Sequence, residues 1–182
     1  MASEDPLFRV SALGMVLECT STSIEIPKYD SVEWIPTTTE LANELADKAV
    51  VGGYEAYDHS SLWVIRARFK NDLVPGKLAI KRKQAYVAFR NAEHEVYDIE
   101  VCCASPQNIR WVDGRDGFTP PTAMVGGCTS SGEHLYIGRT KVNGSITPGK
   151  IHPSLGVMYV SYGLKELSFK NYEVLCVNNL LL

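Results

Sequence analysis

The chain repeats itself at a fixed interval, and this feature constrains its fold more than any other. Four segments of the first half match four of the second with one offset of 73 residues, as in Arg139 minus Arg66. The matched pairs are Leu62–Phe69 with Leu135–Val142, Val74–Lys77 with Thr147–Lys150, Ala85–Phe89 with Met158–Tyr162, and Ile99–Cys103 with Tyr172–Cys176. Chance similarity rarely keeps one register over separate blocks, so the sequence indicates an internal duplication.

The matched blocks have the composition of β-strands. They are rich in aromatic and β-branched residues and partly alternate apolar with polar positions. Asn143-Gly144 predicts a two-residue hairpin turn, and each Pro-Gly pair, Pro75-Gly76 and Pro148-Gly149, predicts a type II turn. Glu40–Lys48 differs, since its helical propensity favours a short helical turn or loop. The predicted fold class is all-β, with two tandem pseudo-symmetric antiparallel β repeats packed into one unit.

The repeat register also predicts the organisation of the chain. Residues 1–33 form an N-terminal segment with an extra strand at Phe8–Val16, residues 34–104 the first repeat, and residues 105–182 the second. Trp34 corresponds to Trp111, and a Gly-Gly turn recurs as Gly52-Gly53 and Gly126-Gly127. A single repeat would leave its apolar face uncovered, so we expect neither to be stable alone.

Composition excludes several classes of protein. The 18 basic and 21 acidic residues nearly balance, which argues against a nucleic-acid partner. No apolar stretch approaches the roughly 18 residues of a membrane span. The N-terminus is acidic before it is apolar, the reverse of a secretory signal. A cytoplasmic location is therefore expected, with non-classical release left open.

Cysteine usage points in the same direction. The five cysteines are odd in number, and Cys102 and Cys103 are adjacent, so no disulfide framework is evident. Spacing such as C-x-x-C, typical of metal sites, is missing. We therefore expect reduced, mostly buried thiols.

Catalytic patterns are also missing from the sequence. None of the four histidines, His59, His94, His134 and His152, belongs to a spaced metal motif. The repeated residues do not form a set of nucleophile, base and orienting group. The sequence therefore predicts a protein that is not an enzyme and that carries no cofactor and no metal.

Each repeat instead has an arginine at a matched position of its longest strand and a lysine directly after its Pro-Gly pair. Arg66 and Arg139 are expected to pair with the repeated glutamates Glu100 and Glu173. The lysines leave two alternatives open. They are either solvated turn residues, or ammonium groups that donate hydrogen bonds at a binding site. A lysine beside a carboxylate suits vicinal sugar hydroxyls, because each hydroxyl both donates and accepts.

These motifs together resemble the DM-nine repeat family. The resemblance covers roughly Trp34 to Val177 and rests on Gly-Gly-Tyr-Glu, Leu-Trp-Val-Ile-Arg, Pro-Gly-Lys and Tyr-Asp-Ile-Glu-Val in the first copy, with close parallels in the second. It implies a two-repeat all-β unit. It also implies a mannose-recognising lectin of innate immunity that can self-associate, in which an acidic residue after the Gly-Tyr pair and the lysine of Pro-Gly-Lys contact the sugar.

Carried onto this chain, the resemblance places one site in each repeat. The first site has Glu55 and Lys77, with glutamate where the family has aspartate. The second has Lys150 and Thr129 in place of the acid, with Glu133 nearby as a substitute. The family's Lys-Glu-His triplet is split between Glu93-His94 and Lys165-Glu166. The first site is therefore the stronger candidate.

The predicted function is binding of mannose or a related sugar without catalysis. The alternative is a protein-interaction or scaffold module that has lost sugar binding, which the altered second site favours. A monosaccharide site is weak, so avidity favours a homodimer that presents several sites to one surface.

Overall fold

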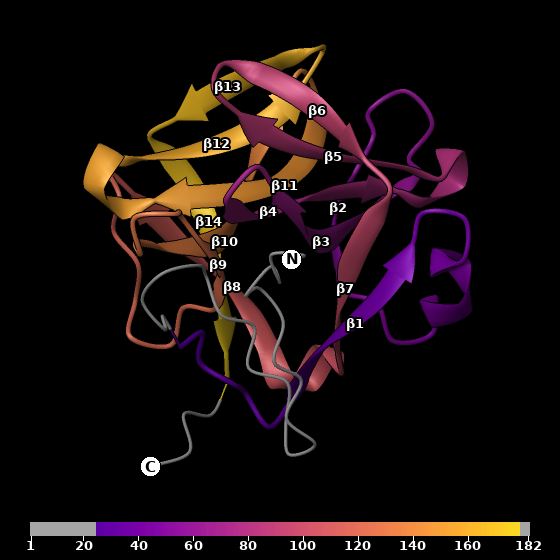
Figure 1. Cartoon of the computed structure of the whole chain (residues 1–182), viewed down its shortest axis with the longest axis horizontal. Helices are drawn as coiled ribbons and strands as arrows, with labels where there is room; N and C mark the ends of the chain where they lie inside the picture. Colours follow the sequence, from indigo (N-terminus) through magenta and orange to yellow (C-terminus); the bar gives the residue numbers. More distant parts are fainter. Residues whose placement is uncertain (1–24, 179–182) are drawn as a thin grey trace, which may run out of the picture.

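A computed structural model describes residues 25–178 and forms one antiparallel β unit (Figure 1). The first repeat contributes β1 (Val32–Thr38), β2 (Val51–Tyr54), β3 (Ser61–Phe69), β4 (Asp72–Ala79), β5 (Gln84–Phe89), β6 (Ala92–Val96) and β7 (Asp98–Ala104). The second contributes β8 (Ile109–Arg115), β9 (Val125–Cys128), β10 (His134–Val142), β11 (Ser145–His152), β12 (Val157–Tyr162), β13 (Lys165–Phe169) and β14 (Asn171–Val177). The strand predicted at Phe8–Val16 lies outside the described residues.

The strands of the two repeats interleave. Strands β2, β3, β4, β9, β10 and β11 pair one after another into a closed ring, in which β4 pairs with β9 and β11 pairs with β2. On one side β7 and β1 extend the sheet from β3, and on the other β14 and β8 extend it from β10. The hairpins β5–β6 and β12–β13 meet above the ring, where Ala92 pairs with Lys165 (Figure 1). The predicted fold class is confirmed.

Apolar packing also crosses between the repeats. Each repeat has its own buried cluster, around Ile65 and Val87 in the first and around Val160 and Val174 in the second. A further cluster joins β3 and β7 of the first repeat to β10 and β14 of the second, with Val64 and Ile137 among its members. Burial of apolar side chains stabilises a fold by about 25 cal/mol per Å², so this shared cluster couples the stability of the two repeats.

The glycine pairs lie where strands of the two repeats pair closely, and not in turns as the sequence predicted. They lie within β2 and β9. A side chain at Gly53 would come within 1.8 Å of the carbonyl oxygen of Ile146, and one at Gly127 within 1.9 Å of that of Leu73. Only glycine allows the repeats to approach this closely.

The turn predictions had mixed outcomes. Asn143-Gly144 does form the β10–β11 turn, with φ angles of 46° and 84°. The Pro-Gly pairs, however, lie inside β4 and β11, where Pro75 faces Arg66 across the ladder. Type II turns at these positions were therefore a wrong prediction, because the register of the long hairpins overrides the local preference. The helical turn predicted within Glu40–Lys48 is a 3₁₀ turn at Ala42–Leu45.

Three thiols match the sequence prediction and one does not. Cys102, Cys103 and Cys176 are free and buried, and burial raises the pKa of each thiol. Cys128 at the end of β9 is disulfide-bonded, so the expectation of reduced cysteines fails there. Cys19 lies outside the described residues. The spacing of cysteines along the chain did not reveal this bond, because pairing depends on their separation in space.

Candidate binding sites at the junction of the repeats

The two repeated lysines are buried at the junction of the repeats. Lys77 on β4 is 5 % exposed and Lys150 on β11 is 6 % exposed. The Nζ of Lys77 donates to the carbonyl oxygen of Ser161 at 2.5 Å, and that of Lys150 donates to the carbonyl oxygen of Ala88 at 2.6 Å. Each acceptor belongs to the opposite repeat. The lysines are therefore neither solvated turn residues nor residues at an exposed rim.

Each lysine forms an ion pair with a glutamate of its own repeat. Lys77 Nζ lies 3.3 Å from Glu93 on β6, and Lys150 Nζ lies 3.1 Å from Glu166 on β13. All four side chains in the two pairs are less than a tenth exposed. Such pairs are costly to desolvate and require good partners on both sides. We call these two arrangements the Lys77 site and the Lys150 site.

A hairpin tip of the opposite repeat completes each site. The backbone N–H of Leu164, at the β12–β13 tip, donates to Glu93, and that of Asn91, at the β5–β6 tip, donates to Glu166. Glu93 Oε2, the oxygen that forms the ion pair with Lys77, accepts no hydrogen bond from the described residues. The hydrogen bonds of both sites thus join the two repeats.

Aromatic rings lie on either side of each ammonium. Lys77 Nζ is 5.5 Å from the centre of the Tyr86 ring and 5.6 Å from that of Tyr162. Lys150 Nζ is 5.4 Å from Tyr159 and 5.7 Å from Phe89. Burial raises the pKa of Tyr86 and of Tyr159. Charged groups beside aromatic rings suit a ligand that has both polar and apolar faces.

The acid predicted to pair with Lys77 has other partners. Glu55 is buried and forms its ion pair with Arg82 at 2.9 Å, and it accepts a hydrogen bond from the hydroxyl of Ser145 at 3.3 Å. Glu55 and Lys77, which were predicted to contact one sugar together, therefore have different ion-pair partners, Arg82 and Glu93. Family resemblance points to Glu55, whereas the ion-pair partner of Lys77 lies on β6, the strand that pairs with β5.

The second set of predicted residues does come together. Thr129 and Lys150 line one cavity of about 340 Å³, along with His152 and Glu166. Glu133 lies beside it, with its carboxylate 3.2 Å from Nδ1 of His152 and accepting two hydrogen bonds from Ser154. Burial alone would raise the pKa of Glu133, but these hydrogen bonds and His152 outweigh it and lower that pKa.

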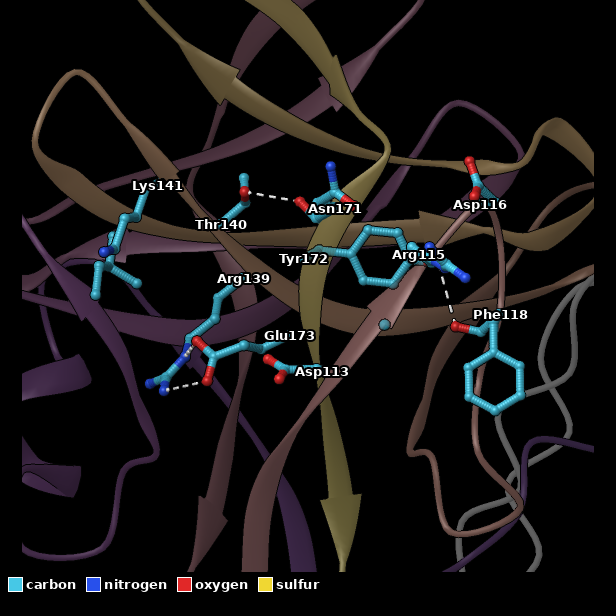
Figure 2. A pocket seen from close by; sticks show the side chains of 12 residues that line it. Asp113, Arg115, Asp116, Phe118, Arg139, Thr140, Lys141, Asn171, Tyr172 and Glu173 are labelled. Carbon is cyan, nitrogen blue, oxygen red and sulfur yellow. Dashed lines mark hydrogen bonds and ion pairs between the residues drawn. The ribbon is translucent and has the colours of Figure 1, made fainter.

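The repeated arginines behave as the sequence predicted. Arg66 pairs with Glu100 and lies 4.3 Å from the centre of the Trp34 ring, and Arg139 pairs with Glu173 at the same distance from Trp111. The Arg139 pair borders a groove of about 1070 Å³, the largest cavity described, which Figure 2 shows from close by. A smaller groove of about 600 Å³ lies at the matching place beside Arg66. We place the candidate site at the lysines, because each buried ammonium has three N–H donors and only two acceptors among the described residues.

The two glutamates are the residues that sequence reasoning left unassigned. Glu93 and Glu166 are 73 positions apart, as are Lys77 and Lys150. A search for charged residues conserved between the repeats would have found them. Within residues 25–178 no cluster of three or more His, Cys, Asp or Glu is arranged to hold a metal. Helices of the length and apolar character needed to cross a membrane are also missing from that range.

Comparison with known proteins identifies the fold and the family. No curated protein sequence matches the chain. Among solved structures, the nematode sperm cell motility protein MFP2B has a TM-score of 0.59 and 11% sequence identity, over 87% of this chain and 49% of that one. This chain thus spans about half the length of MFP2B, and the likeness shows the fold alone. The sequence model of the DM9 repeat matches residues 56–169, more than half of the chain. The chain therefore belongs to the DM9 repeat family.

Proposed function

We propose that this protein binds carbohydrate without catalysis, with mannose or a related sugar held at the junction of its repeats. The observation that carries the proposal is the pair of buried Lys–Glu sites. Each ammonium has three N–H donors and two described acceptors, a carbonyl and a carboxylate. A donor therefore remains for a ligand oxygen, and the carboxylate keeps lone pairs that can accept from a ligand hydroxyl. This combination matches sugar hydroxyls, which both donate and accept.

The surroundings of the sites support the same ligand. The rings of Tyr86 and Tyr162, or of Tyr159 and Phe89, offer apolar faces to the C–H face of a pyranose. In this proposal Glu55 and Thr129, at corresponding positions of the repeats, lie at the outer part of each site. Glu133 acts on the Lys150 site through His152.

Titration calorimetry with mannose tests this function. We expect weak binding by the full chain, and Lys77→Met or Lys150→Met to remove most binding at its own site. Loss of a hydrogen bond to a charged group corresponds to about 10- to 100-fold in affinity. Lys170→Met, a change at an exposed lysine, is the control. Far-ultraviolet circular dichroism must show that each variant is folded. A wild-type protein that binds no sugar would refute the proposal.

Avidity would strengthen such weak sites. A homodimer would present four sites to one glycan surface, and this would suit the innate-immune recognition that the family resemblance suggests. Sedimentation velocity measures the oligomeric state directly. A protein that stays monomeric at all concentrations would remove the dimer from the proposal.

A protein-interaction module is the second candidate. Glu55, the acid that the family resemblance places at the sugar, is already ion-paired with Arg82, which favours this alternative. MFP2B, which shares the fold, is described as a sperm cell motility protein rather than as a lectin. A glycan array without any bound glycan would favour this candidate.

A further inference from the structure

Two hairpin tips of the first repeat bring positive charge to the Lys150 site. Lys70 begins the β3–β4 turn and Arg90 begins the β5–β6 turn, with φ angles of 55° and 49°. Both side chains line the cavity that also contains Lys150. They are exposed, so a ligand in the cavity can reach them.

These two cations have no carboxylate partner among residues 25–178. Their described contacts are with aromatic rings, Lys70 with Phe69 at 5.8 Å and Arg90 with Phe89 at 5.3 Å. The carboxylates that line the same cavity are engaged. Asp72 accepts from the backbone N–H of Ser130 at 2.8 Å.

Glu166, the other carboxylate of the cavity, is engaged twice. It accepts from the N–H of Asn91 at 2.6 Å and pairs with Lys150 at 3.1 Å. The charges of Lys150 and Glu166 cancel. Among the residues that line the cavity, Asp72 is then the one carboxylate left to balance the two cations Lys70 and Arg90. The Lys, Arg, Asp and Glu residues that line the cavity therefore carry one net positive charge, and Glu133 beside it is held by Ser154 and His152.

The Lys77 site lacks these cations. By the 73-residue offset, Lys70 corresponds to Asn143 and Arg90 to Gly163, and both positions keep a positive φ. The backbone of the tips is thus the same in the two repeats, whereas the charge is not. Because a hairpin turn needs no positive charge, a ligand explains the difference better than the fold does.

We propose that the Lys150 site takes an acidic sugar, one that carries a phosphate or carboxylate group, with Lys70 and Arg90 facing the anion. The inference rests on the proposed function and specifies its ligand. Lys150 and Glu166 contact the hydroxyls inside the cavity, and the two exposed cations contact the anionic group at its mouth. Arginine suits this role because its planar guanidinium can donate two parallel hydrogen bonds to an anion.

Calorimetry with four ligands tests the inference on the full chain: mannose, mannose 6-phosphate, glucuronic acid and inorganic phosphate. We expect one or both acidic sugars to bind about tenfold tighter than mannose at low salt, and the advantage to shrink as salt rises. Binding of mannose 6-phosphate alone would identify phosphate as the anion, and binding of glucuronic acid as well would extend the site to carboxylates.

The variant Lys70→Asn/Arg90→Gly gives the Lys150 site the residues of the Lys77 site. Both replacements tolerate a positive φ, so the turns should keep their shape. We expect the variant to lose the advantage of the acidic sugars while its affinity for mannose stays within about twofold. Lys170→Asn, at an exposed lysine outside the cavity, should change nothing.

The outcomes separate the two proposals. Equal affinity of the wild type for mannose and both acidic sugars would overturn the acidic ligand and leave carbohydrate binding intact. Inorganic phosphate that binds as tightly as mannose 6-phosphate would overturn a sugar as the ligand of this site. Absence of binding to every sugar, with or without a charge, would overturn the proposed function itself.

Discussion

The Lys77 and Lys150 sites share their inner parts and differ at their outer parts. In both, a buried lysine contacts a glutamate of its own repeat and a carbonyl of the other. Outside this centre, Glu55 of the first repeat is ion-paired with Arg82, whereas its counterpart Thr129 lines the cavity of the Lys150 site. The residues that join the repeats are thus the same in both copies, whereas the exposed tip residues differ, with Lys70 and Arg90 in one copy and Asn143 and Gly163 in the other. Charges that hold two strands together are constrained by burial, and charges at the mouth of a cavity are not.

The largest expected effect follows from separating the repeats. Residues 106–182 expressed alone should show no cooperative unfolding transition, because β9, β11 and β13 all pair with strands of the first repeat. The shared apolar cluster would also lose half of its buried side chains. Thermal melts followed by circular dichroism, with the full chain as control, measure this. A cooperative, monomeric melt of the fragment would show that the repeats are independent.

Removal of either lysine should reduce the stability of the whole unit. One alternative that the sequence left open, a solvated turn lysine, predicts almost no effect of its removal on the melting temperature. Because Lys77 is buried, Lys77→Met leaves Glu93 as an unpaired buried charge and should cost about 3 kcal/mol. Lys150→Met should cost a similar amount through Glu166.

Urea denaturation of the two lysine variants and the wild type gives these values. Adding Glu93→Gln to Lys77→Met should restore part of the stability, because the uncompensated charge is then gone. A loss below about 0.5 kcal/mol for either lysine variant would mean that its ion pair is solvated.

The Arg–Glu pairs that join the ring strands β3 and β10 to the flanking strands β7 and β14 should respond unequally. The side chains of Arg66 and Glu100 are 6% and 14% exposed, whereas those of Arg139 and Glu173 are 22% and 37% exposed. Arg66→Met should therefore cost about 2–3 kcal/mol, and Arg139→Met less than about 1 kcal/mol. The comparison uses the same urea experiment. Equal costs for the two variants would show that exposure does not set the strength of these pairs.

The smallest expected effect is a pH dependence that arises at Glu133 in the second repeat. The pKa of Glu133 is lowered in the folded state, so its contribution to stability is present above its unfolded pKa of about 4.5 and is lost as pH falls through the folded value. The first repeat has Ser60 at the corresponding position. Glu133→Gln should thus be less stable than the wild type at pH 6, and the difference should vanish toward pH 3. A constant difference at every pH would exclude ionisation of Glu133 as its cause.

Several parts of the candidate site could be predicted from the sequence. The 73-residue register identified Lys77 and Lys150, and it identified the pairing of Arg66 with Glu100 and of Arg139 with Glu173. The same register contained the signal for Glu93 and Glu166. The role of Glu93 and Glu166 does not follow from the family resemblance, which points to Glu55 instead. Glu55 forms its described ion pair with Arg82.

The sequence by itself determined the duplication, the all-β class and the charged residues that recur, because periodic patterns and matched blocks are local properties of a chain. Only the tertiary structure decided that the Pro-Gly pairs lie inside strands, that the lysines are buried and that each site takes its carbonyl from the opposite repeat. The physical reason is that β2 pairs with β11 and β4 with β9 across the repeats. Burial and partners are set by such long-range pairing, and no local preference encodes which strand of the other repeat will cover a given side chain.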